Sequence, residues 1–187
     1  MSRRLLCEPT PLPGLMLIRR QPLADARGSF ERLFCVDELA AFGHPGVVAQ
    51  ANRSCTLHVG AVRGMHFQTP PYGDWKVITC TRGSVHDVIV DLRHGSPTLL
   101  RWHAVTLAED LPLSLLVPPG CAHGFQVMGG PAEMIYLHSH PYVPEADAGV
   151  RADDPRLAIT WPLPIGERSP RDEAHPLLDA TYPGLMP

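Results

Sequence analysis

Two histidines of this chain stand in short motifs whose residue types could carry chemistry. His66 lies in the string RGMHFQ at 63–68, and His123 ends the string PPGCAH at 118–123. An imidazole can ligate a metal ion, or it can act as a general acid or base near neutral pH. These two chemistries need different partners around the histidine, so the other residues of the chain decide between them.

A metal site would need more ligands than these motifs supply. The string at 118–123 fits the P-x-G-x-x-H pattern of the second cupin motif, whose histidine binds the metal in metallocupins. The first cupin motif would require H-x-H and a nearby glutamate, but Gln68 stands at the second histidine position and no glutamate follows closely. Because a catalytic metal needs about three protein ligands, we expect no bound metal. A metal-dependent cupin oxygenase or isomerase that uses His66, His123 and a third ligand is the alternative.

Without a metal, His66 and His123 become candidate bases. Such a base needs a carboxylate to orient it, and the candidates are Asp87, on a predicted strand, and Asp172, in the string RSPRD at 168–172. If a proton is taken from one face of a substrate and returned to the other, an acid is needed on the far side. Tyr136, among apolar neighbours, suits that role. The residues therefore predict an acid-base site.

Lys76 is the only lysine in the chain, beside fifteen arginines. Codon bias accounts for the imbalance, but an ammonium is a compact point charge whereas a guanidinium is a planar fork. A site that needs the first cannot accept the second, so Lys76 is a further candidate for the site. The sequence assigns no role to His86, His138 or His140.

Short strands must position these residues, because proline accounts for 21 of 187 residues, about twice its usual frequency, and leaves little room for long helices. A hairpin is predicted from 77–80 through a turn at 82–84 into 85–92. Further strands are predicted at 99–107, 113–117, 125–128 and 133–138, the last two separated by Gly129, Gly130 and Pro131. One short helix is predicted at 37–42, closed by Gly43. Strands at this spacing favour an all-β sandwich or barrel.

Length and charge exclude several classes of protein. A chain of 187 residues and 20.5 kDa is expected to form a single domain. A net charge of -3 and a pI near 6.3 argue against a nucleic-acid binder. No apolar run is long enough to span a membrane, and the first residues lack the apolar core of a signal peptide, so we expect a cytoplasmic protein. The five cysteines are scattered without a C-x-x-C pair, which favours free thiols.

Several motifs of the chain occur in the same order in a known family. They are DARGSFE at 25–31, QANRS at 50–54, VRGMHFQ at 62–68, DWKV at 74–77, VHDVIVDLR at 85–93, SPT at 96–98, PGCAHGF at 119–125 and SPRD at 169–172. Through them, from Leu17 to Asp179, the sequence resembles the dTDP-4-dehydrorhamnose 3,5-epimerase family, a cofactor-free branch of the cupin superfamily. The resemblance implies a cupin-type β-jelly roll with short peripheral helices. Its core would span about 17–163, and a wrapping C-terminal tail, 164–187, would contribute to the site.

The resemblance also implies an activity and four catalytic residues. The substrate would be a nucleoside-diphosphate 4-keto-6-deoxyhexose, foremost dTDP-4-dehydro-6-deoxyglucose, which is converted to dTDP-4-dehydrorhamnose through an enolate. His66 would be the base, held in one tautomer by Asp172. Tyr136 would be the acid on the opposite face, and Lys76 would place its ammonium at the ketone oxygen. No cofactor is expected.

Binding residues follow from the same resemblance. Arg63 would meet the diphosphate, and His123 would lie in the pocket wall. The family is dimeric because two residues of each subunit reach the nucleotide of its neighbour. The remaining assignments are Gln50 and Asn52 near the diphosphate, Tyr142 stacked on the base, and Arg27 and Glu31 from the neighbouring subunit of the homodimer.

Three departures from the family pattern leave the substrate open. Ala51 stands where many members have aspartate, Leu137 where they have lysine, and His86 where they have an aromatic residue. A mono-epimerase acting on a related dTDP-, CDP- or GDP-linked keto sugar is therefore an alternative. A non-catalytic module that binds sugar nucleotides is a third possibility, although it would not need the four catalytic residues.

Overall fold

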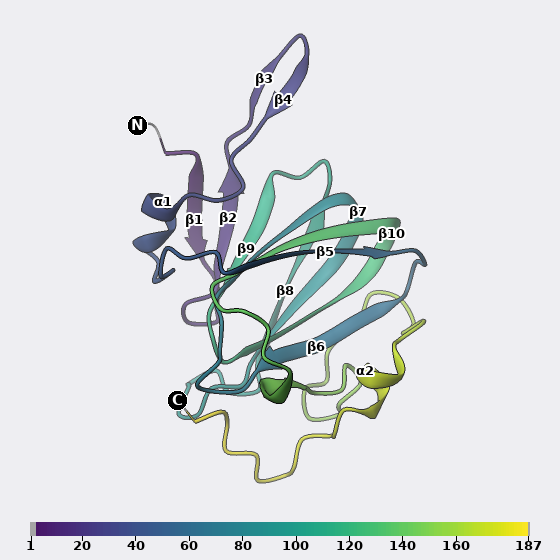
Figure 1. The fold of residues 1–187 in the computed structure, drawn as a ribbon. Coiled ribbons are helices and arrows are strands. Elements are labelled where there is room, and N and C mark those ends of the chain that lie inside the picture. The colour runs from purple at the N-terminus through teal and green to yellow at the C-terminus, as the bar shows by residue number, and fades with distance from the viewer. Residues whose placement is uncertain (1–2, 187) are drawn as a thin grey trace.

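The structure is a computed structural model that describes residues 3–186, and it consists mainly of strands (Figure 1). Two α-helices and a 3-10 helix are short, and the predicted all-β jelly roll with small peripheral helices is confirmed. The strands are β1 (Leu5–Pro9), β2 (Met16–Arg20), β3 (Leu23–Asp25), β4 (Gly28–Phe30), β5 (Gln50–Thr56), β6 (Val62–Gln68), β7 (Lys76–Asp91), β8 (Trp102–Ala108), β9 (Leu113–Val117), β10 (Cys121–His138) and β11 (Asp147–Gly149). The helices are α1 (Val36–Ala40), η1 (Pro144–Ala146) and α2 (Pro170–Ala174).

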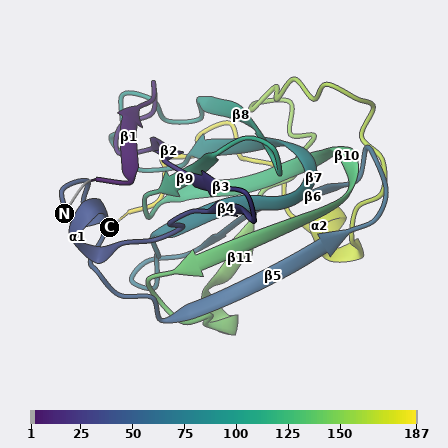
Figure 2. The same ribbon diagram turned by 90° about the horizontal axis from the view of Figure 1, so that it is seen from above.

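Two long strands, β7 and β10, connect the two layers of the jelly roll. β10 pairs with β7 along most of its length, and it also pairs with β6 through its first part and with β5 through its second. The first part of β7 pairs with β9, whereas its second part pairs with β8. Figure 2 shows β5, β7 and β10 running across the molecule. Side chains on these strands can therefore meet from both layers.

The hairpin predicted at 77–92 is wrong, and so is the break predicted at 129–131. The structure has one continuous strand in each place, β7 and β10. Gly83 has a φ of +69°, and a Cβ at this position would lie 2.3 Å from the carbonyl oxygen of Gly129. The glycines therefore allow two bent strands to approach each other closely. At the two places where we expected the chain to reverse, the pairing of β7 with β10 is irregular but continues.

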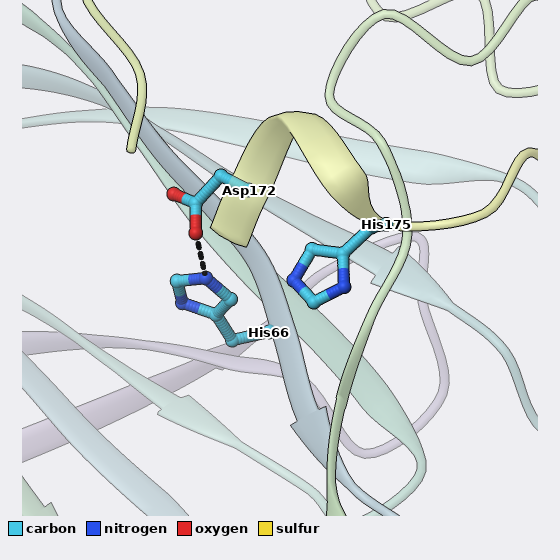
Figure 3. A group of neighbouring side chains, drawn as sticks. All are labelled: His66, Asp172 and His175. Atoms are coloured by element: carbon cyan, nitrogen blue, oxygen red, sulfur yellow. Dashed lines mark hydrogen bonds and ion pairs between the residues drawn. The ribbon is translucent and has the colours of Figure 1, made fainter. Parts of the chain in front are cut away.

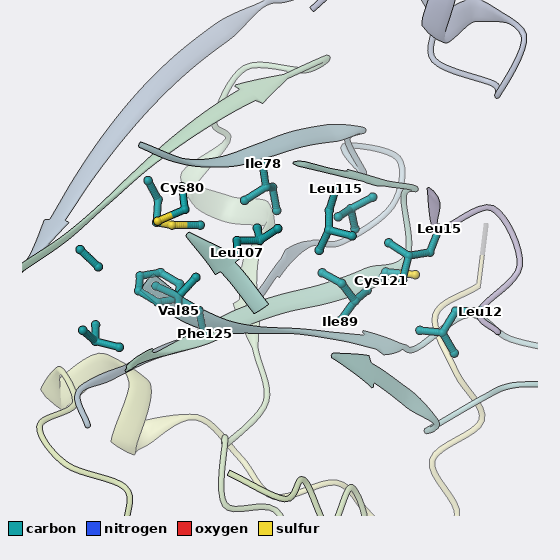
Figure 4. Close-up of a cluster of buried hydrophobic side chains, with 14 residues drawn as sticks. Leu12, Leu15, Ile78, Cys80, Val85, Ile89, Leu107, Leu115, Cys121 and Phe125 are labelled. Atoms are coloured by element: carbon teal, nitrogen blue, oxygen red, sulfur yellow. The ribbon is translucent and has the colours of Figure 1, made fainter. Parts of the chain in front are cut away.

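The hydrophobic core lies inside the barrel, and a second cluster lies on its outer face. Ile78, Ile89 and Phe125 are buried in the inner cluster (Figure 4). Val88 and Val90 alternate with Ile89 along β7 and pack in the outer cluster. C-terminal segments cover this outer cluster with Trp161, Leu178, Tyr182 and Leu185. These contacts fix the path of the tail that carries α2.

The hairpin of β3 and β4 forms a separate two-stranded sheet that projects away from the barrel (Figure 1). All residues of both strands are exposed, and Phe30 exposes 74% of its surface. The short helix predicted at 37–42 is present as α1, whereas α2 was not predicted. Among residues 3–186, the structure contains no helix that is long and apolar enough to cross a membrane.

Asp91 makes folding stability depend on pH. Burial by itself would raise the pKa of Asp91, but hydrogen bonds from Arg93, Ser96 and Thr98 outweigh burial and lower the pKa to about 2. Because the pKa of Asp91 is lower in the folded than in the unfolded protein, Asp91 stabilises the folded state at any pH above its unfolded pKa of about 3.9. This contribution is lost as the pH falls to about 2. We expect the unfolding free energy to fall between pH 5 and pH 2 by about 2 kcal/mol more than in Asp91→Asn. Urea unfolding checks this, and parallel pH curves for the two proteins would contradict it.

Candidate active site

Two cavities of the structure adjoin each other and share part of their lining. The first, of about 290 Å³, is lined by residues that include His123 and Tyr136, and we call it the Tyr136 cavity. The second, of about 210 Å³, includes Gln50 and Tyr142, and we call it the Tyr142 cavity. Five residues line both cavities and so mark their junction: Asn52, His66, Lys76, His138 and Arg171.

His66 and Asp172 form a hydrogen-bonded pair although they are 106 residues apart in sequence. His66 lies on β6, and its Nε2 is 2.9 Å from Oδ1 of Asp172, which lies on α2 (Figure 3). Ser169 begins this helix, because its hydroxyl accepts a hydrogen bond from the backbone N–H of Asp172. The other carboxylate oxygen of Asp172 accepts from the N–H of Gly64 at 3.1 Å. Asp172 is thus held at both oxygens.

The protonation of this pair follows from its contacts. Burial by itself would raise the pKa of Asp172, but the bonds from His66 and Gly64 outweigh burial and hold the pKa well below its usual range. The ionised carboxylate can only accept hydrogen bonds, so Nε2 of His66 carries the proton. The lone pair of the neutral ring is then on Nδ1. This tautomer makes Nδ1 a proton acceptor in the cavity wall.

A second pair, His123 and Asp87, lies beside the first. His123 is directly opposite His66 in the pairing of β10 with β6, and its Nε2 is 2.9 Å from Oδ2 of the fully buried Asp87. The two strands approach closely at Gly64, where a Cβ would lie 2.6 Å from the Cα of Gly124. The two candidate orienting carboxylates therefore serve different histidines: Asp172 contacts His66, and Asp87 contacts His123.

Tyr136 enters the same cavity from the second half of β10. Its hydroxyl is 3.1 Å from the hydroxyl of Ser54 on β5, and its ring meets His123 edge-on with the centroids 5.9 Å apart. Burial, together with the negative charge of Asp87, raises the pKa of Tyr136 above its usual range. Like an ordinary tyrosine, Tyr136 is protonated near neutral pH, and its phenol carries a proton into the cavity.

Lys76 lies at the first position of β7 with its ammonium largely buried. Its Nζ is 2.7 Å from Oδ1 of Asp74, and only 9% of the lysine is exposed. Burial by itself would raise the pKa of Asp74, but the hydrogen bond from His138 and the charge of Lys76 outweigh burial and lower it. The pair places a fixed ammonium at the junction of the two cavities.

The predicted binding residues divide into two groups. Arg63 lines the Tyr136 cavity and donates from Nε to Thr56 Oγ1 at 2.8 Å. Gln50 and Tyr142 line the Tyr142 cavity, and Asn52 lines both cavities. Together with the catalytic candidates, these residues surround one continuous site.

Arg27 and Glu31 are not brought to these cavities within one chain. Arg27, in the turn of the β3–β4 hairpin, pairs with Asp25 at 2.6 Å. Glu31 follows β4 and pairs with Arg20 at 2.7 Å. Neither residue lines the Tyr136 or the Tyr142 cavity.

Sequence reasoning missed Arg171, although the string SPRD contains it. Its Nη1 is 2.7 Å from Asp147 Oδ2, and its Nη2 is 3.1 Å from His66 Nε2. Arg171 therefore adds a positive charge at the junction of the cavities. Its position beside Asp172 was the available signal, since any helix that delivers Asp172 to His66 also brings its neighbour close.

Three side chains could in principle hold a metal ion: His66, Asp172 and His175 have ligand atoms within 4.8 Å of one another (Figure 3). Nε2 of His175 is buried without a hydrogen-bond partner in the described part of the chain. However, the Arg171 guanidinium lies 3.1 Å from His66 Nε2, the nitrogen that bonds to Asp172, and 3.7 Å from Asp172 Oδ1. Because this positive charge would repel a cation, the cluster does not fit a metal site.

Comparisons with known proteins identify the family of the chain. The family model described as dTDP-4-dehydrorhamnose 3,5-epimerase matches residues 9–180. A curated relative, the dTDP-4-dehydrorhamnose 3-epimerase of Streptomyces niveus, is 41% identical over 181 residues, which cover 96% of this chain and 87% of the relative.

Solved structures show the same similarity. A 4-keto-6-deoxy sugar epimerase from the novobiocin gene cluster of Streptomyces spheroides matches with a TM-score of 0.88 and 38% identity, over 95% of this chain and 89% of that chain. A dTDP-6-deoxy-D-glucose-3,5-epimerase from Legionella pneumophila, in complex with dTDP-4-keto-L-rhamnose, matches with a TM-score of 0.85 and 32% identity, over 91% of each chain.

Proposed function

The chain belongs to the dTDP-4-dehydrorhamnose 3,5-epimerase family and is an isomerase of nucleoside-diphosphate keto sugars, and on this premise we propose how its residues perform the reaction. The substrate is a dTDP-linked 4-keto-6-deoxyhexose, foremost dTDP-4-dehydro-6-deoxyglucose. The enzyme inverts the carbons that flank the ketone. The observation that carries the proposal is one cavity lined by His66, paired with Asp172, together with Tyr136 and Lys76.

His66 begins the reaction as the base. A hydrogen on a carbon next to a ketone is acidic, because the electron pair left behind delocalises onto the ketone oxygen as an enolate. Nδ1 of His66 accepts this proton, and the ring becomes an imidazolium. Asp172 stabilises that cation through its bond to Nε2, as a carboxylate partner does for other catalytic histidines.

Lys76 stabilises the enolate. The negative charge develops on the ketone oxygen, and the buried ammonium lies in the wall of the same cavity. A charge that is already oriented needs no reorganisation during the reaction, and this kind of stabilisation is often the largest contribution to catalysis. A guanidinium is a broad planar fork and would not fit the same compact position.

Tyr136 completes the inversion. Its phenol donates a proton to the carbon from the face opposite His66, and the enolate collapses to the ketone with the centre inverted. A tyrosine phenol is protonated near neutral pH, so Tyr136 holds the proton at the start. Solvent then returns a proton to the phenolate and removes one from His66, so that the second carbon can react in the same way.

The nucleotide lies along the remaining polar residues of the two cavities. Arg63 and Arg171 bind the diphosphate, because guanidinium groups match phosphate oxygens well. Gln50 and Asn52 lie near the diphosphate, and Tyr142, which exposes 51% of its surface, is free to stack on the base. His123 forms part of the wall beside the sugar.

The site is completed by a second copy of the chain. The β3–β4 hairpin projects from the barrel with Arg27 at its turn, and the exposed Phe30 gives it an apolar surface that a partner can cover. In a homodimer, Arg27 and Glu31 would reach the nucleotide of the neighbouring subunit. Sedimentation equilibrium is expected to give about twice the chain mass, and a monomer at micromolar concentration would contradict this assembly.

Solvent deuterium incorporation tests the activity itself. We expect the protein to introduce deuterium at both carbons beside the ketone of dTDP-4-dehydro-6-deoxyglucose, measured by mass spectrometry and proton NMR. CDP- and GDP-linked analogues serve as matched controls and should react more slowly. Exchange at one carbon would instead identify a mono-epimerase. Absence of exchange with all three nucleotides would contradict the proposed function.

A further inference from the structure

His138 is the histidine at the cavity junction that the mechanism above does not use. It lies two residues after Tyr136 on β10, and its ring stacks on the Tyr136 ring with centroids 6.2 Å apart. Its main-chain position pairs with Lys76 on β7 and with Gln50 on β5. This register places the imidazole between the catalytic lysine and the residues proposed to bind the nucleotide.

Asp74 joins His138 to Lys76. One carboxylate oxygen, Oδ1, accepts from the lysine ammonium at 2.7 Å, and the other, Oδ2, is 2.6 Å from Nδ1 of His138. Only 2% of Asp74 is exposed, so solvent cannot replace either partner. With its lowered pKa, Asp74 is ionised and can only accept, and Nδ1 of His138 must therefore carry a proton.

The other ring nitrogen of His138 faces the nucleotide side. Nε2 is 3.3 Å from the amide nitrogen of Asn52, which donates to it when the ring is neutral. That contact fixes the orientation of the amide, because the Asn52 oxygen then accepts from Gln50 Nε2 at 3.1 Å. The Gln50 oxygen in turn accepts from the backbone N–H of Tyr142 at 2.9 Å.

We propose that His138 is a positioning residue for the epimerisation, which connects the catalytic ammonium to the nucleotide-binding amides. Nδ1 of His138 donates to Oδ2 of Asp74. This bond prevents the carboxylate from turning so that both of its oxygens contact the Lys76 ammonium. Through Nε2, His138 orients Asn52, and Asn52 orients Gln50. One side chain thus aligns the enolate-stabilising group with the bound nucleotide. The proposal rests on the proposed function for the identity of the substrate.

Two substitutions separate the halves of this connection. In His138→Asn, the amide nitrogen can replace Nδ1 and still donate to Asp74, but nothing replaces Nε2. We expect the KM for dTDP-4-dehydro-6-deoxyglucose and the Kd for dTDP to rise roughly tenfold, with kcat changed by less than about threefold. In His138→Gln, the longer amide can replace Nε2 at Asn52 but not Nδ1 at Asp74. Here kcat should fall roughly tenfold, with Kd for dTDP nearly unchanged.

The neighbouring His140 offers matched controls on the same segment. It is half-buried, packs edge-on against Tyr72 and lines neither cavity, so His140→Asn and His140→Gln should match the wild type. Melting temperatures show whether each variant folds. Equal losses of kcat and binding in both His138 variants would indicate a merely structural role and overturn the proposal, and so would variants that match the His140 controls.

The outcome also separates this proposal from the function on which it rests. A wild-type protein that incorporates no deuterium would contradict the proposed function, and this inference with it. An active wild type whose His138 variants lack the opposite changes in kcat and Kd would contradict this inference alone. Opposite changes in the two variants would support it.

Discussion

His66→Asn is expected to lower both deuterium incorporation and epimerisation by about 10²–10⁴-fold, because a positioned base typically contributes that much. The asparagine amide nitrogen occupies the place of Nδ1 without a basic lone pair, so the proton next to the ketone has no acceptor. Asp172 would remain held by Gly64 and Ser169, which keeps the local fold intact. Mass spectrometry of the sugar nucleotide after incubation in deuterated water measures the effect.

His123→Asn is the matched control for this experiment. His123 has the same kind of carboxylate partner at the same distance, and it lines the same cavity opposite His66. Because His123 is part of the pocket wall, His123→Asn should lower turnover by less than about tenfold. If His123→Asn lost more activity than His66→Asn, the base would be His123 with Asp87, and the assignment of His66 would be wrong.

Tyr136→Phe is expected to separate exchange from inversion. The phenylalanine keeps the ring in contact with His123 but removes the proton that Tyr136 donates from the far face. His66 can still remove a proton and return one from the solvent to the same face. We therefore expect epimerised product to fall by about 10²–10⁴-fold while deuterium still enters the starting sugar at one or both carbons. Proton NMR distinguishes the deuterated starting sugar from the inverted product.

Tyr142→Phe applies the same substitution to the tyrosine of the adjacent cavity. Its hydroxyl bonds to Asp147 at 3.1 Å, outside the Tyr136 cavity, so inversion should continue at nearly the wild-type rate. Loss of exchange and inversion in equal measure in Tyr136→Phe would show that the tyrosine acts in the first proton transfer as well. Unchanged inversion in that variant would show that another group is the acid.

Much of the fold was accessible from local patterns. The strand predicted at 113–117 is present at the same residues as β9, and the strand predicted at 85–92 lies within β7 up to Asp91. The prediction of a hairpin at 77–92 was wrong because a glycine with positive φ is compatible with either a turn or a bend. β10 approaches Gly83 closely through Gly129, and this contact favours a bend over a turn. Gly129 is nearly fifty residues away in the sequence, so local patterns could not reveal the contact.

The catalytic candidates show the same division. Residue types and order were enough to select His66, Tyr136 and Lys76, because acid-base chemistry needs an imidazole, a phenol or a compact cation. Residue types alone left open which of Asp87 and Asp172 serves which histidine. The family resemblance assigned Asp172 to His66, and the structure brings these two groups together. The sequence did not single out Arg171 or give His138 a role, since their partners lie on other elements.

By itself, the sequence determined the kinds of groups in this protein, its all-β character and its family, because these depend on side-chain chemistry and on motifs within short segments. Through the family resemblance, the sequence also paired Asp172 with His66, and the structure agrees. The tertiary structure alone decided the pairing of Asp87 with His123 and the connection from Lys76 to Asn52. A hydrogen bond forms only where two groups lie about 3 Å apart. For residues far apart in the chain, strand register and the path of the tail set that distance.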